Sequence, residues 1–188
     1  MKIGIDIDDT ISNTNEYLIE EAVKYDRLYK KKGIRDNTTY DFCGFFNWEK
    51  NDKYDFYKYI YDNNLHEVPV KSHAKEIINK LKKEGHKIYI ITRRDTDIYK
   101  DPYKETYKWL KKKKIKFDKL IVQAKDKGSV CKELEVDIFI DDLLSNCIRA
   151  HEEGINVLMF NSPYNQNEKN FKRVVSWEEI YNIVNGVR

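Results

Sequence analysis

The sequence predicts an α/β fold, a doubly wound parallel sheet of about five strands with a small helical insertion. Residues 2–8 have the alternating pattern of a strand, with isoleucine at every second position. From Pro69 onward, short apolar runs alternate with amphipathic segments, which is typical of parallel strands joined by helices. No strand is evident between residues 13 and 66. The chain therefore predicts one sheet interrupted early by helices.

Residues 13–68 are expected to form the helical insertion, and residues 1–12 with 69–188 the core that holds the sheet. Two helices are expected in the insertion, separated by an irregular segment that is rich in aromatic residues. Their apolar faces have helical spacing and comprise Leu18, Ala22, Tyr25 and Tyr29 in the first helix, and Tyr54, Tyr57, Tyr61 and Leu65 in the second.

The remaining elements of the core follow in chain order. Short apolar runs predict strands at residues 87–92, 120–122, 136–140 and 157–160. Residues that favour the first positions of a helix mark the helices, namely Ser72, Asp101 before Pro102, Ser145, and Ser176 in a capping box. Glycines at positions 85 and 154 are expected to end two of these helices.

Composition limits the kinds of partner and compartment. Charged residues make up 36% of the chain, yet the net charge of +3 is too small to favour nucleic acid. The three cysteines, Cys43, Cys131 and Cys147, show no spacing of a disulfide framework or zinc site, which fits a reducing compartment. The chain enters a strand at once, and no apolar run approaches the ~20 residues that span a bilayer. We expect a cytoplasmic protein without a membrane partner, and a homodimer is compatible with the sequence.

Acidic residues crowd at two predicted strand ends. Asp6, Asp8 and Asp9 follow the first strand, and Asp141 with Asp142 follows another. One such cluster is usually a solvated turn, but two clusters at parallel strand ends are expected to meet at the same edge of the sheet. Oxygen ligands of this kind suit Mg²⁺ better than Zn²⁺. The sequence therefore predicts a magnesium site.

Further polar residues at element ends could bind an anion. Thr92 closes a predicted strand and is followed by Arg93, so that its hydroxyl, nearby backbone N–H groups and the arginine could hold phosphate. Lys127 stands just before a predicted helix and could reach between a carboxylate and a phosphate oxygen. Lys125 is a rival for that role, and we prefer Lys127 because it leads directly into the helix.

In chain order, these groups resemble the motifs of the haloacid dehalogenase superfamily of phosphatases and phosphotransferases. The residues that carry the resemblance are Asp6-x-Asp8-x-Thr10, Thr92, Lys127 and Asp141-Asp142. The resemblance covers residues 2 to about 160. It implies a Rossmann-like core with strand order 3-2-1-4-5, Mg²⁺ as cofactor, and a small phosphorylated substrate.

The resemblance also implies a role for each of these residues. Asp6 would be the nucleophile that forms an aspartyl-phosphate, and Asp8 the general acid and base. Thr92 would bind the phosphate, and Lys127 would join Asp6 to the phosphoryl group that is transferred. The metal would be held by Asp6, the backbone carbonyl of Asp8, and Asp141 with Asp142, of which Asp142 is our choice for the direct ligand.

One position departs from the superfamily pattern. Asp9 stands where glycine usually follows the second aspartate. That position can require an unusual backbone conformation, which aspartate tolerates better than most residues. A further negative charge near phosphate is unfavourable unless the side chain points away.

The chain resembles more narrowly the 5′(3′)-deoxyribonucleotidases and the bacterial nucleotidases grouped with them. The features behind this are the helical insertion, the run from Ile91 to Arg94, and the tail from Phe160 through the Ser176 capping box. The leading hypothesis is a nucleotidase acting on (deoxy)nucleoside monophosphates. A ring of the segment 40–48 could stack on the base, although these rings could equally be the insertion's own core.

Three alternatives remain. The stretch 92–101 is similar to the phosphatase domains of polynucleotide kinases, which keeps a polynucleotide 3′ end as a substrate and nucleic acid as a less favoured partner. A sugar-phosphate phosphatase is the second alternative. A catalytically silent ligand-binding protein is the third, and the presence of both Asp6 and Asp8 argues against it.

Overall fold

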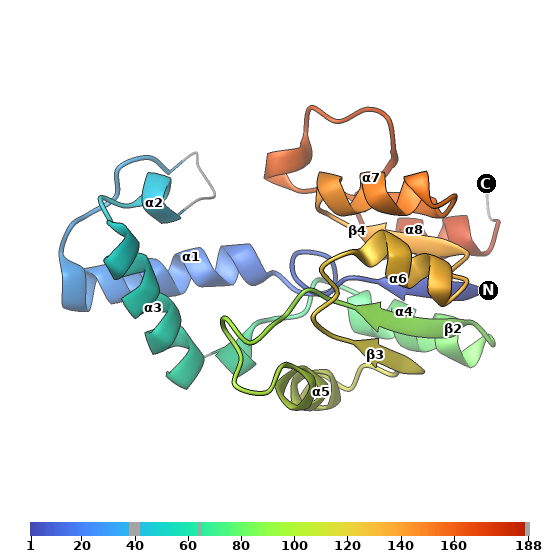
Figure 1. The fold of residues 1–188 in the computed structure, drawn as a ribbon, viewed down its shortest axis with the longest axis horizontal. Helices are drawn as coiled ribbons and strands as arrows, with labels where there is room; N and C mark the ends of the chain where they lie inside the picture. The colour runs from blue at the N-terminus through green and yellow to red at the C-terminus, as the bar shows by residue number, and fades with distance from the viewer. Residues whose placement is uncertain (38–41, 64, 187–188) are drawn as a thin grey trace. The chain divides into compact units, whose positions relative to one another are not determined.

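The computed structural model describes residues 1–37, 42–63 and 65–186. The chain divides into two compact units, which are described separately (Figure 1). One comprises residues 1–12 and 70–188 and holds the sheet, and the other comprises residues 13–69. Within the residues just given, no helix is long and apolar enough to cross a bilayer.

The sheet has six strands in the order β3-β2-β1-β4-β5-β6, and every neighbouring pair is parallel. The strands are β1 (Lys2–Ile5), β2 (Lys87–Ile91), β3 (Lys119–Ile121), β4 (Ile138–Asp141), β5 (Asn156–Phe160) and β6 (Lys172–Val174). The predicted class and the order of the first five strands are confirmed. The sixth strand adds an edge that the sequence analysis missed, because its three residues include two basic side chains and carry no apolar run.

Helices cover both faces of this sheet. They are α4 (Ala74–Lys83), α5 (Pro102–Lys112), α6 (Lys127–Glu133), α7 (Leu144–Glu152) and α8 (Trp177–Val184). Apolar residues of α4, α5 and α8 join one buried cluster with alternate residues of the strands. Residues of α6 and α7 join a second cluster with the intervening strand residues. The alternation of side chains along each buried strand therefore builds two cores.

The helix starts agree only in part with the sequence. Asp101 and Ser176 cap α5 and α8 with their side chains, as predicted. Ser72 does not cap α4, because the N-cap residue is His73 in a left-handed conformation with φ of 58°. Helix α7 begins one residue before the expected start, at Leu144.

The second unit is helical in its described residues. Its elements are α1 (Thr14–Tyr25), a π-helical turn η1 (Asp26–Lys30), α2 (Phe42–Phe45), α3 (Lys50–Asn63) and a 3-10 turn η2 (Leu65–Glu67). Its core is largely aromatic and consists of Ala22, Tyr25, Phe45, Phe46, Trp48, Phe56 and Ile60.

The π-helical turn changes which side chains of the first helix are buried. The extra residue per turn carries Tyr29 out of the predicted apolar face, and Tyr29 is 59% exposed. Asp26 is buried instead and accepts hydrogen bonds from Trp48 Nε1 at 2.6 Å and from the backbone N–H of Gly33 at 2.9 Å. These donors satisfy the hydrogen-bonding capacity of the buried carboxylate, so the π-helical turn can place Asp26 in the core of this unit.

The predicted apolar face of α3 is wrong at Tyr54, whereas Tyr57 does pack against the core of this unit, and the side chain of Leu65 lies outside the described residues. Tyr54 is 70% exposed, whereas Phe56 and Ile60 are fully buried. The aromatic segment before α3 supplies the core of this unit through Phe46 and Trp48, whose rings stack at 4.4 Å between centroids. For these rings the structure favours the core over base stacking. Tyr40 and the side chain of Phe42 lie outside the described residues.

Candidate active site

Strand register brings the two acidic ends together. Ile5 of β1 is paired with Ile140 of β4, so the next residues, Asp6 and Asp141, lie side by side at the carboxyl edge of the sheet. The backbone N–H of Asp6 donates to the carbonyl of Ile140 at 3.0 Å, which continues the ladder into the acidic segment. Parallel pairing of two short strands is therefore enough to gather these carboxylates.

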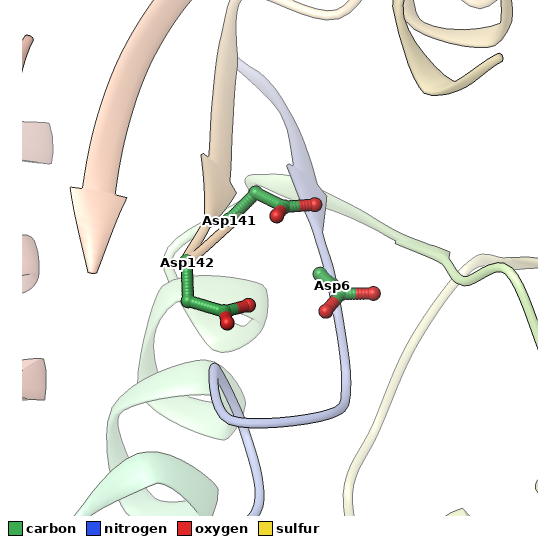
Figure 2. A group of neighbouring side chains, drawn as sticks. All are labelled: Asp6, Asp141 and Asp142. Carbon is green, nitrogen blue, oxygen red and sulfur yellow. The ribbon is translucent and has the colours of Figure 1, made fainter. Parts of the chain in front are cut away.

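Asp6, Asp141 and Asp142 form a cluster with ligand oxygens all within 4.8 Å of one another. All three side chains are buried, and Figure 2 shows them projecting from the two neighbouring strand ends toward a shared space. The donor set is entirely carboxylate oxygen, which is the chemistry that hard cations prefer. This cluster can hold a metal ion.

The ammonium group of Lys127 brings a positive charge into the cluster. Its Nζ donates to Asp6 Oδ1 at 2.6 Å and to Asp141 Oδ2 at 2.8 Å, and the residue is 3% exposed. Burial disfavours its charge, yet Asp6 and then Asp141 outweigh that effect and raise the pKa of Lys127. Lys125, the rival for this position, is exposed.

The start of α6 seats Lys127. Asp126 caps this helix by accepting from the backbone N–H of Ser129 at 3.3 Å. A Cβ atom on Gly128 would lie 2.5 Å from the carbonyl oxygen of Arg149 in α7, so only glycine permits this approach of the two helices. Figure 1 shows α6 and α7 side by side. Close packing at Gly128 fixes the backbone from which Lys127 reaches Asp6.

Protein donors fix the two carboxylates after β4 in different ways. Asp141 accepts from the backbone N–H of Leu143 at 2.8 Å and from Asn146 Nδ2 at 3.1 Å. Asp142 Oδ1 accepts from Thr10 Oγ1 at 3.1 Å, and its Oδ2 accepts from the hydroxyl of Tyr164. Each carboxylate is therefore oriented before any ligand binds.

The charge balance of the cluster is negative, because three buried carboxylates face one buried ammonium group. Burial raises the pKa of Asp6 well above its ordinary value, although Lys127 opposes that shift. Burial and then Asp141 raise the pKa of Asp142 to about 7. A bound cation would relieve this excess of negative charge.

The carboxylate of Asp8 is not part of this cluster. It is paired with Arg94, with Nη2 at 2.7 Å from Oδ1 and Nε at 3.0 Å from Oδ2. The metal role expected of Asp8 uses its backbone carbonyl, and that role stays a prediction. Arg94 is buried, whereas Arg93, the predicted phosphate ligand, is exposed.

Thr92 is buried at the end of β2, at the same edge of the sheet as the acidic cluster. Its hydroxyl accepts from the backbone N–H of Arg94 at 3.3 Å and retains a proton to donate. Asp9 has φ of 59°, so the left-handed conformation expected at this position is present. Its Oδ2 lies 3.2 Å from the hydroxyl of Tyr164.

Sequence reasoning missed Arg94, Asn146 and Tyr164. Arg94 could have been found by continuing the two-residue alternation of the extended chain beyond Thr92. Tyr164 follows the carboxyl end of β5, next to β4, which is the edge where ligands bind in such sheets. Asn146 lies in the first turn of α7 and gave no signal of its own.

The whole chain matches a known protein family. Residues 1–188 match the family model described as 5′ nucleotidase, deoxy (pyrimidine), cytosolic type C protein. A nucleotidase candidate of Bacillus subtilis, YqfW, is 32% identical over 95% of this chain and 91% of that protein. A nucleotidase of Clostridium acetobutylicum is 31% identical over 98% of this chain and 93% of that protein.

Solved structures of haloacid dehalogenase-type hydrolases share the fold. A family member from Streptococcus pneumoniae aligns with a TM-score of 0.69 at 15% identity, over 97% of both chains. A Bacillus subtilis hydrolase of this type, solved with magnesium bound, aligns with a TM-score of 0.65 at 13% identity, over 98% of both chains. These structures confirm the fold that the superfamily resemblance implied, and the family match confirms the narrower resemblance to nucleotidases.

Proposed function

The chain belongs to the family of 5′ nucleotidases, deoxy (pyrimidine), cytosolic type C, and on that premise we propose that it is a cytoplasmic, Mg²⁺-dependent nucleotidase that hydrolyses (deoxy)nucleoside monophosphates through an aspartyl-phosphate. The observation that carries the proposal is the buried cluster of Asp6, Asp141 and Asp142 with Lys127 inside it. Family membership supports a phosphatase of the nucleotidase type, and the cluster supports the metal and the nucleophile.

The residues present fit a divalent cation. Three buried carboxylates against one ammonium leave a negative balance, and no nitrogen or sulfur ligand belongs to the cluster among the described residues. Asp6 and Asp142 would hold the ion, with the backbone carbonyl of Asp8, while Asp141 keeps Lys127 in place. When bound, Mg²⁺ would offset negative charge on the phosphate and on the carboxylates that meet it.

Asp6 is proposed as the nucleophile. Its Oδ1 accepts from Lys127, which can also reach a phosphate oxygen and so bring two anions together. A bond forms between Asp6 and phosphorus while the bond from phosphorus to the ester oxygen breaks. Thr92 would donate its hydroxyl proton to a phosphate oxygen, and Arg93 would add charge at the exposed side.

Asp8 is proposed as the general acid and base. In the first half of the reaction it gives a proton to the departing alkoxide, and in the second half it takes a proton from the water that cleaves the aspartyl-phosphate. The pair with Arg94 fixes the position of the Asp8 carboxyl group. The proton that Asp8 gives to the alkoxide in the first half is restored by the proton that it takes from water in the second half, so the residue ends the cycle as it began.

A screen of phosphate release tests the proposal. We expect hydrolysis of nucleoside monophosphates with Mg²⁺ and none after chelation, and we expect Asp6→Asn to abolish turnover. Asp137→Asn is the matched control, because Asp137 precedes β4 at the end of the strand away from Asp141. Sugar phosphates or 3′-phosphorylated oligonucleotides as the best substrates would replace the nucleotide assignment. Absence of any phosphatase activity with Mg²⁺ would favour the silent binding protein.

A further inference from the structure

Tyr164 reaches the acidic cluster from a part of the chain that the motifs do not include. It lies in the 3-10 turn η3 (Pro163–Asn165), just beyond the carboxyl end of β5. Its hydroxyl donates to Asp142 Oδ2 and lies 3.2 Å from Asp9 Oδ2. One phenol therefore meets the loop after β4 and the loop after β1 at once.

The turn that carries Tyr164 is held firmly from both sides. Asn165 Nδ2 donates to the backbone carbonyl of Asp142 at 2.7 Å and to that of Phe160 at 2.8 Å. Arg173 of β6 donates to the backbone carbonyls of Asn165 at 2.7 Å and Glu168 at 2.8 Å. The edge strand β6 therefore holds the turn through Arg173, and the turn makes hydrogen bonds to both the backbone and the side chain of Asp142.

The opposite oxygen of Asp142 is fixed by the first motif. Thr10 Oγ1 donates to Oδ1 at 3.1 Å, and the backbone carbonyl of Thr10 accepts from Trp177 Nε1 at 3.2 Å. With a donor on each oxygen, the Asp142 carboxylate has one preferred orientation. Donors that orient a ligating carboxylate in this way usually contribute to metal affinity.

We propose that Tyr164 is a positioning residue that holds Asp142 ready for the divalent cation. The inference rests on the proposed function, because it concerns the same metal site. It adds a residue from outside the four motifs, and it assigns to the turn after β5 the role of orienting Asp142. A hydroxyl carries one proton, so Tyr164 donates to Asp142, the more deeply buried of the two carboxylates that it meets.

A purely structural role for this hydroxyl makes a different prediction. Loss of a hydrogen bond that only braces the turn would lower the melting temperature and leave the affinity for Mg²⁺ unchanged. Loss of a positioning contact weakens Mg²⁺ binding even where the fold is intact. The readout that separates the two is therefore metal affinity measured without substrate.

The experiment uses the full chain and the variant Tyr164→Phe, which removes the hydroxyl and keeps the ring. Tyr103→Phe is the matched control, because Tyr103 is an exposed tyrosine of α5. Calorimetric titration with Mg²⁺ should show a dissociation constant raised roughly 10- to 100-fold in Tyr164→Phe and unchanged in Tyr103→Phe. The Mg²⁺ concentration for half-maximal turnover should rise in parallel, and kcat should recover largely at saturating Mg²⁺.

The outcomes separate this inference from the proposed function. Equal Mg²⁺ affinity in wild type and Tyr164→Phe, with wild type binding the ion and hydrolysing nucleotides, would overturn the role of Tyr164 alone. A lower kcat at unchanged Mg²⁺ affinity would overturn it as well. Failure of wild type to bind Mg²⁺ would overturn both the proposed metal dependence and this inference.

Discussion

Arg94 holds both carboxylate oxygens of Asp8, with Nη2 at 2.7 Å from Oδ1 and Nε at 3.0 Å from Oδ2. The guanidinium is buried and lies over the rings of Tyr99 at 5.4 Å and Trp109 at 5.3 Å. Asp8 therefore faces a fixed arginine, while Asp6, two residues earlier, faces Lys127. Two neighbouring carboxylates are thereby given different surroundings, which suits different roles.

Arg94→Lys tests the geometry of this pair. Lysine keeps the positive charge but replaces a planar fork with a single point charge, so Asp8 loses its two-point attachment. We expect turnover to fall roughly 10²-fold, because a misplaced acid–base group reacts poorly. Steady-state kinetics on the best nucleotide substrate measures this. Arg27→Lys, at an exposed position of η1, is the control and should retain wild-type kinetics. Wild-type turnover in Arg94→Lys would show that the fork is dispensable.

Asp8→Asn tests the assignment of the proton. The amide cannot exchange a proton, so turnover should fall roughly 10²–10⁴-fold for an alkyl phosphate such as a nucleoside monophosphate. The loss should be smaller for p-nitrophenyl phosphate, whose leaving group hardly needs a proton. The measurement is the ratio of alkyl to aryl rates in wild type and variant. An unchanged ratio would contradict the role of Asp8 as general acid.

The strand ends and their register explain why much of the site could be predicted. Asp6 and Asp141 end apolar runs, and parallel pairing alone places such ends together. The position of Lys127 followed from its place at the start of a helix. The placement of these residues can be predicted because it follows from local patterns that are visible in a single sequence.

Contacts made by loops could not be predicted in the same way. Arg94 meets Asp8 across 86 positions of the chain, and Tyr164 meets Asp142 from a turn whose path depends on Arg173. In the helical unit, the π-helical turn shifts Tyr29 out of the predicted face. Such features are set by packing between distant segments, which periodicity does not record.

Gly128→Ala tests whether the contact between α6 and α7 positions Lys127. The added Cβ would meet the backbone carbonyl of Arg149 at 2.5 Å, so one helix must move. We expect the free energy of unfolding to fall by about 1–3 kcal/mol, as is typical of overpacking. Turnover should also fall, because Lys127 is the preceding residue and would shift from Asp6.

Chemical denaturation and kinetics measure the two effects of that substitution. Glu133→Ala, at an exposed position of α6, is the control, and it should change the unfolding free energy by no more than about 0.5 kcal/mol. Gly128→Ala with wild-type stability and turnover would show that α6 can move away without cost.

Asp52 gives the helical unit a pH dependence of known sign. Its Oδ2 accepts from Lys32 Nζ at 2.6 Å and from the backbone N–H of Glu49 at 2.9 Å. The hydrogen bond from Lys32, followed by that from Glu49, lowers the pKa of Asp52 to about 2. An unfolded chain has an aspartate pKa of about 3.9, so the stabilisation is complete above that value and is lost as pH falls toward about 2.

Asp52→Asn should therefore cost roughly 1–2 kcal/mol at neutral pH, and the difference from wild type should shrink in acid. Urea unfolding of both proteins at about pH 7 and about pH 2.5 measures this difference. Asp55→Asn on the same helix is the control, because Asp55 pairs with Lys30 at 51% exposure and an exposed pair contributes little. A stability difference for Asp52→Asn that is equal at both pH values would mean that the charge of Asp52 does not stabilise this unit.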